Sequence, residues 1–326
     1  MTRASRLVFL FLSLLPFLAT TVAHAESPWP TKQPIKLIIP YAPGGGSDVI
    51  GRLLAAHLSK ELGQQVIPDN RPGAGASLGV AIAARAPADG YTLLLGNSAS
   101  TMASAQLRKV SYDPRKDFEP IAGVAANNTL LVARKDLPAN NFAELKALAL
   151  AKPGTVSCGT AGLGSGAHMA CEYFAELAGI KLLMVHYKGS SEALNDLIGG
   201  RIDIVFDPTA LPRIKAGQAK LLAARSEGGK RLADMPDVPS FAEQGLPAMT
   251  DELWFGVLAP AGTPRAIVDR IAAAAKTYTQ SPEIAASLKA FGEYPHYIGP
   301  DELKAQMPKD WDYFGGLIER HHMRID

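Results

Sequence analysis

The sequence has almost no net charge and no basic cluster. Its 33 Lys and Arg residues nearly balance 31 Asp and Glu residues, which leaves a formal charge of +2 over 326 residues. Nucleic acids and anionic membrane surfaces attract concentrated positive charge, so this balance argues against both kinds of partner. After the N-terminal region, no apolar run approaches the roughly 20 residues needed to cross a bilayer. There is no low-complexity stretch and no internal repeat beyond an α/β alternation.

Cysteine is also scarce, with only Cys158 and Cys171. The first stands at the end of a predicted strand, and the second lies inside the helix predicted to follow it. In an oxidising compartment the two could form a disulfide. They could equally be two small buried residues without a bond between them. The sequence leaves both alternatives open.

The first 25 residues have the pattern of an export signal. Arg3 and Arg6 are followed by the apolar run Leu7–Leu18 and by Ala23-His24-Ala25, a small-residue cleavage site before Glu26. The apolar run is too short for a retained membrane anchor, the alternative interpretation, and no Cys follows the cleavage site to carry a lipid. We expect cleavage after Ala25 and a soluble periplasmic protein. The remaining 301 residues would carry 31 basic and 31 acidic residues, and thus no net charge.

A strand, a glycine loop and a helix are predicted near the beginning of the chain, and we expect the rest of the chain to be organised around them. Ile35–Ile39 is a short apolar run that predicts a buried strand, and apolar spacing from Ser47 predicts a helix with Ser47 or Asp48 as its N-cap. The loop Pro43–Gly46 between them has almost no side chains. Free backbone N–H groups at the positive end of a helix dipole can bind an anion. A flexible turn without a ligand is the alternative.

Strands continue to alternate with helices, which predicts an α/β fold with mostly parallel sheets flanked by helices. Ligands bind such sheets at the carboxyl ends of the strands, so the loops after Ile39 and Leu95 should face one crevice. We expect one lobe from residues 26–125 plus 250–326 and an inserted lobe from 126–249, with a hinged cleft between them. The further strands that we predict are Gln65–Pro68, Tyr91–Leu95, Phe118–Ala126, Thr129–Arg134, Thr155–Cys158, Leu183–Tyr187, Ile202–Asp207, Leu221–Ala224 and Trp254–Pro260, and the further helices Phe142–Ala151, His168–Ala178, Ser191–Ile198, Leu211–Ala216, Pro264–Tyr278, Pro282–Lys289 and Pro300–Glu319.

A second glycine loop, Gly159–Gly166, again lies between a predicted strand and a predicted helix. Its glycines match a permissive dinucleotide pattern, which would need an acidic residue at the end of the next strand to hold a ribose. That place holds His186-Tyr187-Lys188. A backbone cradle for a carboxylate, assisted by the hydroxyls of Thr160 and Ser165, fits the residues better.

Two further patterns could indicate chemistry. Gly96–Ser100 is one residue away from a nucleophile elbow, so an exported α/β hydrolase could use Ser98 with Asp207 and either His296 or His321. We favour the interpretation that Ser98 donates its hydroxyl to a ligand. Asp207, expected where a strand ends at the cleft, would suit the ammonium group of an amino acid or could cap the next helix.

Three other residues have ordinary alternatives. His168, at the beginning of a predicted helix, could be a base or a metal ligand, but no Cys, His, Asp or Glu stands at metal-ligand spacing around it. A packing or capping role is therefore favoured, and no metal is expected. Arg52 and Arg71 could each hold a carboxylate, or could be structural.

Six motifs in one order resemble the Bug family of extracytoplasmic solute receptors, the binding components of tripartite tricarboxylate transporters. They are Pro40–Asp48, Asn70–Gly75, Ala88–Leu93, His186–Gly189, Pro236–Ser240 and Ala259–Pro264. The resemblance covers nearly the whole chain after the signal. It implies a two-lobed Venus-flytrap protein that binds small carboxylates such as amino acids, di- and tricarboxylates or aromatic acids, and that has no enzymatic activity and no cofactor.

The resemblance also implies where the ligand lies. Two glycine loops would hold one carboxylate, partly through ordered water, and Cys158 stands where an aromatic residue is common, which would alter the pocket wall. We expect a monomer that serves uptake or sensing, with transporter membrane subunits as further partners. The ligand-binding residues expected are Tyr41, Pro43, Gly44, Gly45, Gly46, Ser47, Asp48, Asn97, Ser98, Ala99, Gly159, Thr160, Ala161, Gly162, Gly164, Ser165, His168 and Asp207.

Overall fold

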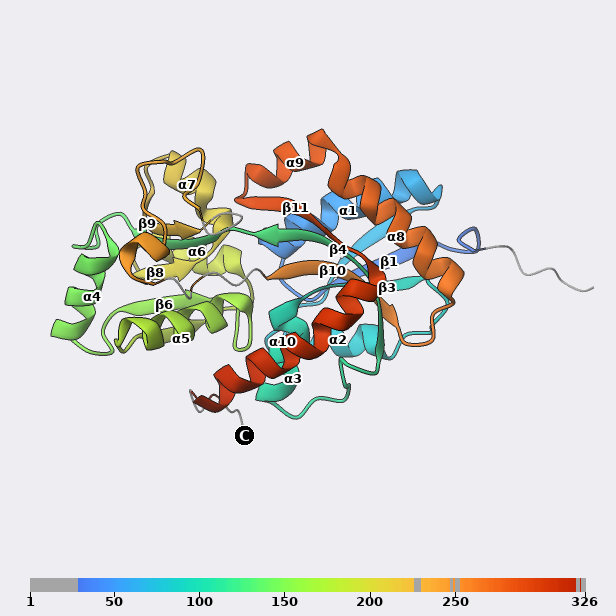
Figure 1. The fold of residues 1–326 in the computed structure, drawn as a ribbon, viewed down its shortest axis with the longest axis horizontal. Coiled ribbons are helices and arrows are strands. Elements are labelled where there is room, and N and C mark those ends of the chain that lie inside the picture. The colour runs from blue at the N-terminus through green and yellow to red at the C-terminus, as the bar shows by residue number, and fades with distance from the viewer. Residues whose placement is uncertain (1–28, 226–229, 247–248, 250–252, 321–322, 324–326) are drawn as a thin grey trace, which may run out of the picture.

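The fold is described from a computed structural model, which covers residues 29–225, 230–246, 249, 253–320 and 323. The expected signal, residues 1–25, lies outside these residues. Two α/β halves stand side by side, each built around its own sheet (Figure 1). Within the part of the chain that the structure describes, every helix is too short or too polar to cross a membrane.

The first half is built on a six-stranded sheet in the order β11-β4-β10-β3-β1-β2. β1 pairs in parallel with β2 and β3, whereas β10 and β11 run antiparallel to their neighbours. The strands are β1 (Ile35–Ile39), β2 (Val66–Asn70), β3 (Thr92–Asn97), β4 (Phe118–Asn127), β10 (Trp254–Pro260) and β11 (Glu293–Ile298); the helices are α1 (Gly46–Leu62), α2 (Ser77–Ala84), α3 (Ser104–Leu107), α8 (Arg265–Gln280), α9 (Pro282–Lys289) and α10 (Pro300–Arg320), with a π-helical turn η1 (Ala99–Ala103).

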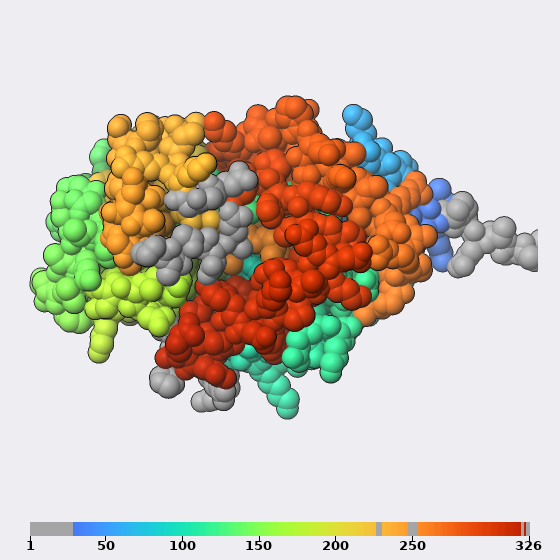
Figure 2. Space-filling view, viewed as in Figure 1, coloured from blue at the N-terminus to red at the C-terminus, as the bar shows by residue number. Residues whose placement is uncertain are grey.

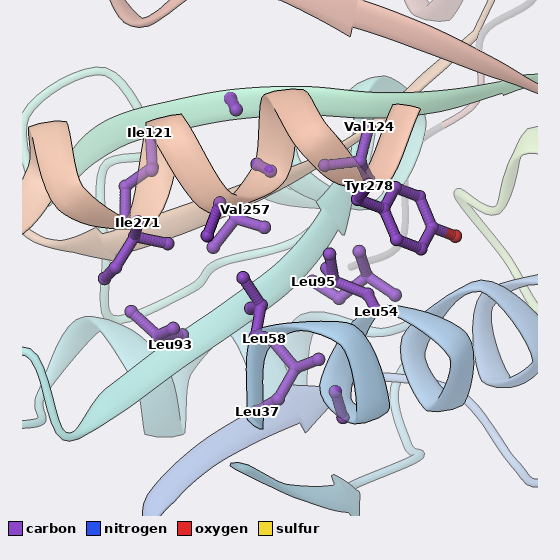
Figure 3. Packing of buried hydrophobic residues seen from close by; sticks show 14 of the residues in the cluster. Leu37, Leu54, Leu58, Leu93, Leu95, Ile121, Val124, Val257, Ile271 and Tyr278 are labelled. Carbon is purple, nitrogen blue, oxygen red and sulfur yellow. The ribbon is translucent and has the colours of Figure 1, made fainter. Parts of the chain in front are cut away.

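Alternating side chains give this sheet two apolar faces, as expected of strands that are covered on both sides. Leu37 and Leu93 point toward α1 and α8, where they pack with residues such as Leu54 and Ile271 (Figure 3). The side chains of the same strands that point to the opposite face of the sheet pack against α2, η1 and α10. The sheet is therefore fixed from both sides, and the ends of its strands hold the loops that follow them in place.

The second half contains a five-stranded sheet in the order β7-β6-β8-β5-β9. Cys158 and Cys171 form a disulfide, with Cα atoms 6.4 Å apart, that joins β6 to α5. The strands are β5 (Thr129–Arg134), β6 (Ser157–Thr160), β7 (Leu183–His186), β8 (Ile204–Phe206) and β9 (Ala219–Arg225); the helices are α4 (Phe142–Ala151), α5 (Gly166–Ala178), α6 (Ser190–Ile198) and α7 (Leu211–Lys215), with 3-10 turns η2 (Pro208–Ala210) and η4 (Ala242–Gln244).

The chain passes from the first sheet to the second between β4 and β5, with only Asn128 between the two strands. It returns between β9 and β10. A third connection is made by α10, which runs across the face shown in Figure 2 to the edge of the second half. There Arg320 Nε lies 3.6 Å from Glu176 Oε1 of α5.

The α/β class and the positions of the predicted strands are confirmed, but three expectations were wrong. Both sheets are mixed rather than mostly parallel. No strand was expected at β11, an edge strand that contains Pro295 and lacks apolar alternation; proline is tolerated at a sheet edge, so the pattern was uninformative. The N-cap of α1 is Gly45, not Ser47 or Asp48, because the helix begins within the glycine loop.

We expect the disulfide to contribute substantially to stability. It closes a loop with a sequence separation of 13 residues, for which loop-closure entropy predicts about 3 kcal/mol. The double variant Cys158→Ala/Cys171→Ala should melt several degrees lower, and a reducing agent should lower the melting temperature of the natural protein only. An equal effect of reductant on both proteins would contradict this prediction.

Candidate ligand-binding site

A cleft lies between the two halves. It encloses about 780 Å³ of space between atoms, including its open mouth. The described residues that line it come from both halves: Tyr41, Ala42, Gly45, Gly46, Ser47, Asn97, Asn127, Asn128, Thr129, Leu130, Ala161, Ser165, Gly166, Ala167, Ala170, Ser190, Phe206, Asp207, Pro208, Leu253, Phe255 and Glu293. None of these residues is a Lys, Arg or His, so a bound anion would have to rely on backbone N–H groups, hydroxyls and amides.

Two helices begin at this cleft, one from each half. The first N–H groups of a helix have no acceptor within it. Those of Gly46 and Ser47 in α1, and of Gly166 and Ala167 in α5, have no acceptor elsewhere among the described residues. Together with the helix dipoles, they make the cleft favourable for a negative group.

The beginning of α5 is held in shape by its own side chains. Ser165 is the N-cap, and its hydroxyl accepts a hydrogen bond of 3.2 Å from the His168 N–H. The His168 Nδ1 in turn accepts one of 3.1 Å from the Gly164 N–H. His168 is thus a buried residue that orders the glycine loop, which agrees with the packing role favoured from the sequence.

Asp48 orders the first glycine loop in a similar way. Its carboxylate accepts hydrogen bonds from the Gly44 N–H at 2.9 Å, from Arg52 Nε at 2.9 Å and from Asn70 Nδ2 at 3.0 Å. Burial alone would raise the pKa of Asp48, but these hydrogen bonds together lower it. Asp48 therefore does not line the cleft, and Arg52 is committed to Asp48 rather than to a ligand.

Two carboxyl groups face the cleft from opposite halves. Glu293 of β11 is 1% exposed, and neither of its oxygens has a hydrogen-bond partner among the described residues. Asp207, which follows β8, is 5% exposed and accepts hydrogen bonds from the Thr209 N–H and hydroxyl at 2.8 and 2.6 Å. Burial raises the pKa of both groups, and Asp207 raises that of Glu293 further.

Uncharged polar groups complete the lining. The Tyr41 hydroxyl lies near Asn97 and Ser100 but makes no well-formed hydrogen bond with a described residue, and burial raises the pKa of Tyr41 to about 12. Asn97 Oδ1 accepts a hydrogen bond of 2.7 Å from the Ser100 N–H. Asn128 donates to the Gly292 carbonyl at 2.8 Å, which connects the crossing between the halves to the residue before Glu293.

Eight of the eighteen expected site residues line the cleft and ten do not. Those that line it are Tyr41, Gly45, Gly46, Ser47, Asn97, Ala161, Ser165 and Asp207. Those that do not are Pro43, Gly44, Asp48, Ser98, Ala99, Gly159, Thr160, Gly162, Gly164 and His168. Most of the second set hold the two glycine loops in shape or lie where the two halves meet.

The residues required by the hydrolase hypothesis are not brought together. Asp207 lines the cleft, whereas Ser98 lines a separate cavity with Gln306, Lys309 and Asp310, and its buried hydroxyl has no partner among the described residues. His296 lines a third cavity. His321 lies outside the described residues.

Several of the glycines allow the backbones of the two halves to approach closely. A Cβ added to Gly75, before α2, would lie 1.8 Å from the carbonyl oxygen of Leu163 in the second half. One added to Gly189 would lie 2.9 Å from the Cβ of Ala42. The Ser191 hydroxyl donates to the Pro43 carbonyl at 3.0 Å across the same boundary. Residues in or next to each glycine loop thus contact the opposite half, and both loops also contribute residues to the cleft.

Fourteen of the 22 residues that line the cleft were not among the expected site residues, above all Glu293. That residue stands in a stretch to which no element was assigned, and a single Glu among aromatic residues gives no sign of burial. Asn127, Asn128 and Thr129 could have been found, because polar residues at a predicted crossing between two lobes are expected to face the cleft. In the described part of the chain, no group of three or more His, Cys, Asp or Glu side chains could hold a metal ion.

Comparison with known proteins identifies the family. Residues 50–321 match the family model described as tripartite tricarboxylate transporter family receptor. The chain belongs to this receptor family. The receptor is 33% identical over 322 residues to the protein BugT of Bordetella pertussis, an alignment that covers 98% of this chain and 97% of BugT. The resemblance to the Bug family seen in the sequence is therefore confirmed.

Solved structures agree with the fold of the receptor. The periplasmic binding protein BugD aligns with a TM-score of 0.84 and 30% identity, over 90% of this chain and 99% of BugD. A protein from R. palustris, solved with adipate, aligns with a TM-score of 0.84 and 31% identity, over 90% of this chain and 98% of its own. The expected two-lobed fold of a periplasmic binding protein is thus confirmed.

The unpartnered Glu293 should make the ligand-free protein less stable as the pH rises. Its raised pKa means that the folded chain keeps a proton that the unfolded chain loses near the usual value of 4.5, so stability falls as pH rises above that value. Glu293→Gln should therefore raise the melting temperature at neutral pH by a few degrees, with little effect below about pH 4. Asp207 and Tyr278, the titratable groups coupled to Glu293, remain in both proteins. A lower melting temperature at pH 7 would contradict the prediction.

The close contact at Gly75 can be tested with a matched pair of variants. Gly75→Ala would force the Leu163 carbonyl away, whereas Gly63→Ala places a Cβ at a similar left-handed φ, +66° against +60°, with no atom within 4 Å. Both variants strain the backbone, but only the first should separate the halves. Small-angle X-ray scattering should give a larger radius of gyration for Gly75→Ala than for Gly63→Ala. Equal radii would show that the halves do not meet there in solution.

Proposed function

We propose that this receptor captures a small organic carboxylate between its two halves and presents it to membrane subunits for uptake or sensing. The observation that carries the proposal is the convergence of the α1 and α5 N-termini, one from each half, on a cleft whose described lining has no cationic side chain. Adipate in the R. palustris structure is a carboxylate of this kind.

Capture by two halves explains how binding would be signalled. A ligand that contacts both helix N-termini binds the closed arrangement more strongly than an open one, and it shifts the population toward the closed state. Membrane subunits could then distinguish loaded from empty receptor by shape. The receptor itself would leave the ligand unchanged, without a cofactor and as a monomer.

We propose the domain division 26–125 plus 250–326 for the first lobe and 126–249 for the second. The strands of the two sheets are distributed between these ranges almost without exception; only the last residues of β4, Ala126 and Asn127, fall beyond the boundary. Export to the periplasm with cleavage after Ala25 belongs to the same proposal, since a receptor of this kind must meet its ligand outside the inner membrane. N-terminal sequencing of the exported protein would test the cleavage site.

A thermal-shift screen would test the function. The mature protein is unfolded, freed of bound compounds, refolded and melted with di- and tricarboxylates, amino acids and aromatic acids. A carboxylate at 100 times its dissociation constant should add about 2.7 kcal/mol of stability. Recovery of the unchanged compound would support a receptor, whereas recovery of a modified compound or the absence of any shift would count against the proposal.

The role of the α5 N-terminus can be tested by removing one N–H group. Gly166 is the first residue of α5, where proline fits a helix, and Ser165 before it has the extended backbone that proline requires. Gly166→Pro should weaken carboxylate binding at least about tenfold relative to Gly166→Ala, because a hydrogen bond to a charged group is worth roughly 1.5–3 kcal/mol. The Ala variant adds the same Cβ near Leu253 and keeps the N–H. Equal affinities of the Pro and Ala variants, measured by calorimetry, would show that the Gly166 N–H does not bind the carboxylate.

A further inference from the structure

Glu293 is the least satisfied polar group of the cleft. It is buried, both of its oxygens lack a partner among the described residues, and it lines the same cleft as the two helix N-termini. A Cβ added to Gly46 would lie 2.6 Å from Glu293 Oε1, so the carboxyl group is close to the beginning of α1. Buried polar groups in native proteins are almost always hydrogen-bonded, and this one is therefore available to a ligand.

A second acid reaches the cleft from the other half. Asp207 is held by Thr209, through hydrogen bonds to one of its oxygens, Oδ1. The position of its carboxyl group is thus fixed before any ligand arrives. Glu293 and Asp207 come from β11 and from the end of β8, so a group between them would touch both halves.

The two acids have no counter-charge in the lining. None of the described residues around the cleft is Lys, Arg or His. Two carboxyl groups buried together are costly unless a cation joins them, and the described lining of the cleft supplies none. The helix N-termini, in contrast, favour a negative group. The cleft therefore has one part suited to an anion and another suited to a cation.

We propose that the ligand is a zwitterion of the amino-acid class, with its carboxylate at the N-termini of α1 and α5 and its ammonium group between Glu293 and Asp207. This inference rests on the proposed function and narrows its ligand class. An ammonium group has three N–H donors, enough to satisfy both acids at once. A dicarboxylate would bring a further negative group to the two acids.

Matched pairs of compounds test the inference directly. We would measure binding of L-aspartate against succinate, L-glutamate against glutarate, and L-phenylalanine against 3-phenylpropanoate, by calorimetry on refolded protein. The members of each pair differ in the ammonium group. At least one amino compound should bind tenfold or more tightly than its counterpart, which is 1.4 kcal/mol. Equal binding, or preference for the compounds without an ammonium group, would overturn the inference.

Variants show whether the two acids are responsible. Glu293→Gln should weaken binding of the amino compound at least tenfold and leave binding of its counterpart unchanged or tighter. Asp207→Asn, which keeps the Oδ1 acceptor, should change both affinities in the same direction. Glu283→Gln, on the exposed side of α9, is the matched control and should change neither. Thermal melts establish that each variant is folded. If Glu293→Gln and Asp207→Asn weaken binding of both compounds equally, the acids have a structural role and the inference is overturned.

The outcomes separate the inference from the proposed function. If succinate, glutarate or 3-phenylpropanoate binds and none of the amino compounds does, the carboxylate receptor stands and the ammonium site falls. If none of the six compounds binds and denaturation of freshly purified protein releases no carboxylate, both fall. Release of a compound that contains both an ammonium and a carboxylate group would support both.

Discussion

The close approach of two backbones is the constraint on which this structure depends. Where the turn before α2 meets the second glycine loop, a Cβ on Gly75 would lie only 1.8 Å from the Leu163 carbonyl oxygen, which leaves no room for a side chain. The absence of side chains brings the halves together and also leaves the helix N–H groups uncovered. One property of the sequence therefore creates both the boundary between the halves and the part of the cleft that suits an anion.

Polar groups in the glycine loops are hydrogen-bonded within the protein, whereas two polar groups of the cleft have no partner in the described part of the chain. Asp48, His168 and Thr160 each accept a hydrogen bond from a backbone N–H of the loops, and these bonds hold the N–H groups in fixed directions. Glu293 and the Tyr41 hydroxyl, in contrast, have no hydrogen-bond partner in the cleft among the residues that the structure describes. Rigid loops around an unsatisfied interior are what a binding site requires, because a ligand then gains hydrogen bonds without having to order its surroundings.

The sequence predicted the regular parts of this molecule well, for physical reasons. Buried strands such as Ile35–Ile39 are continuous apolar runs, and a cluster of glycines between an apolar run and a helical pattern directly indicates a loop. It did not predict which loop residues line the cleft. Asp48 and Ser98 lie in the expected loops but face elsewhere, because orientation depends on partners such as Arg52 that are brought close only by folding. Glu293 was invisible because burial at a sheet edge depends on the opposite half.

The crossing between the halves has a mechanical consequence. Asn128 is the only residue between β4 and β5, and Asn127, Asn128 and Thr129 all line the cleft. A connection this short leaves the halves few torsions about which to rotate relative to one another. The residues that carry those torsions line the cleft, so a bound ligand would contact the hinge between the halves directly.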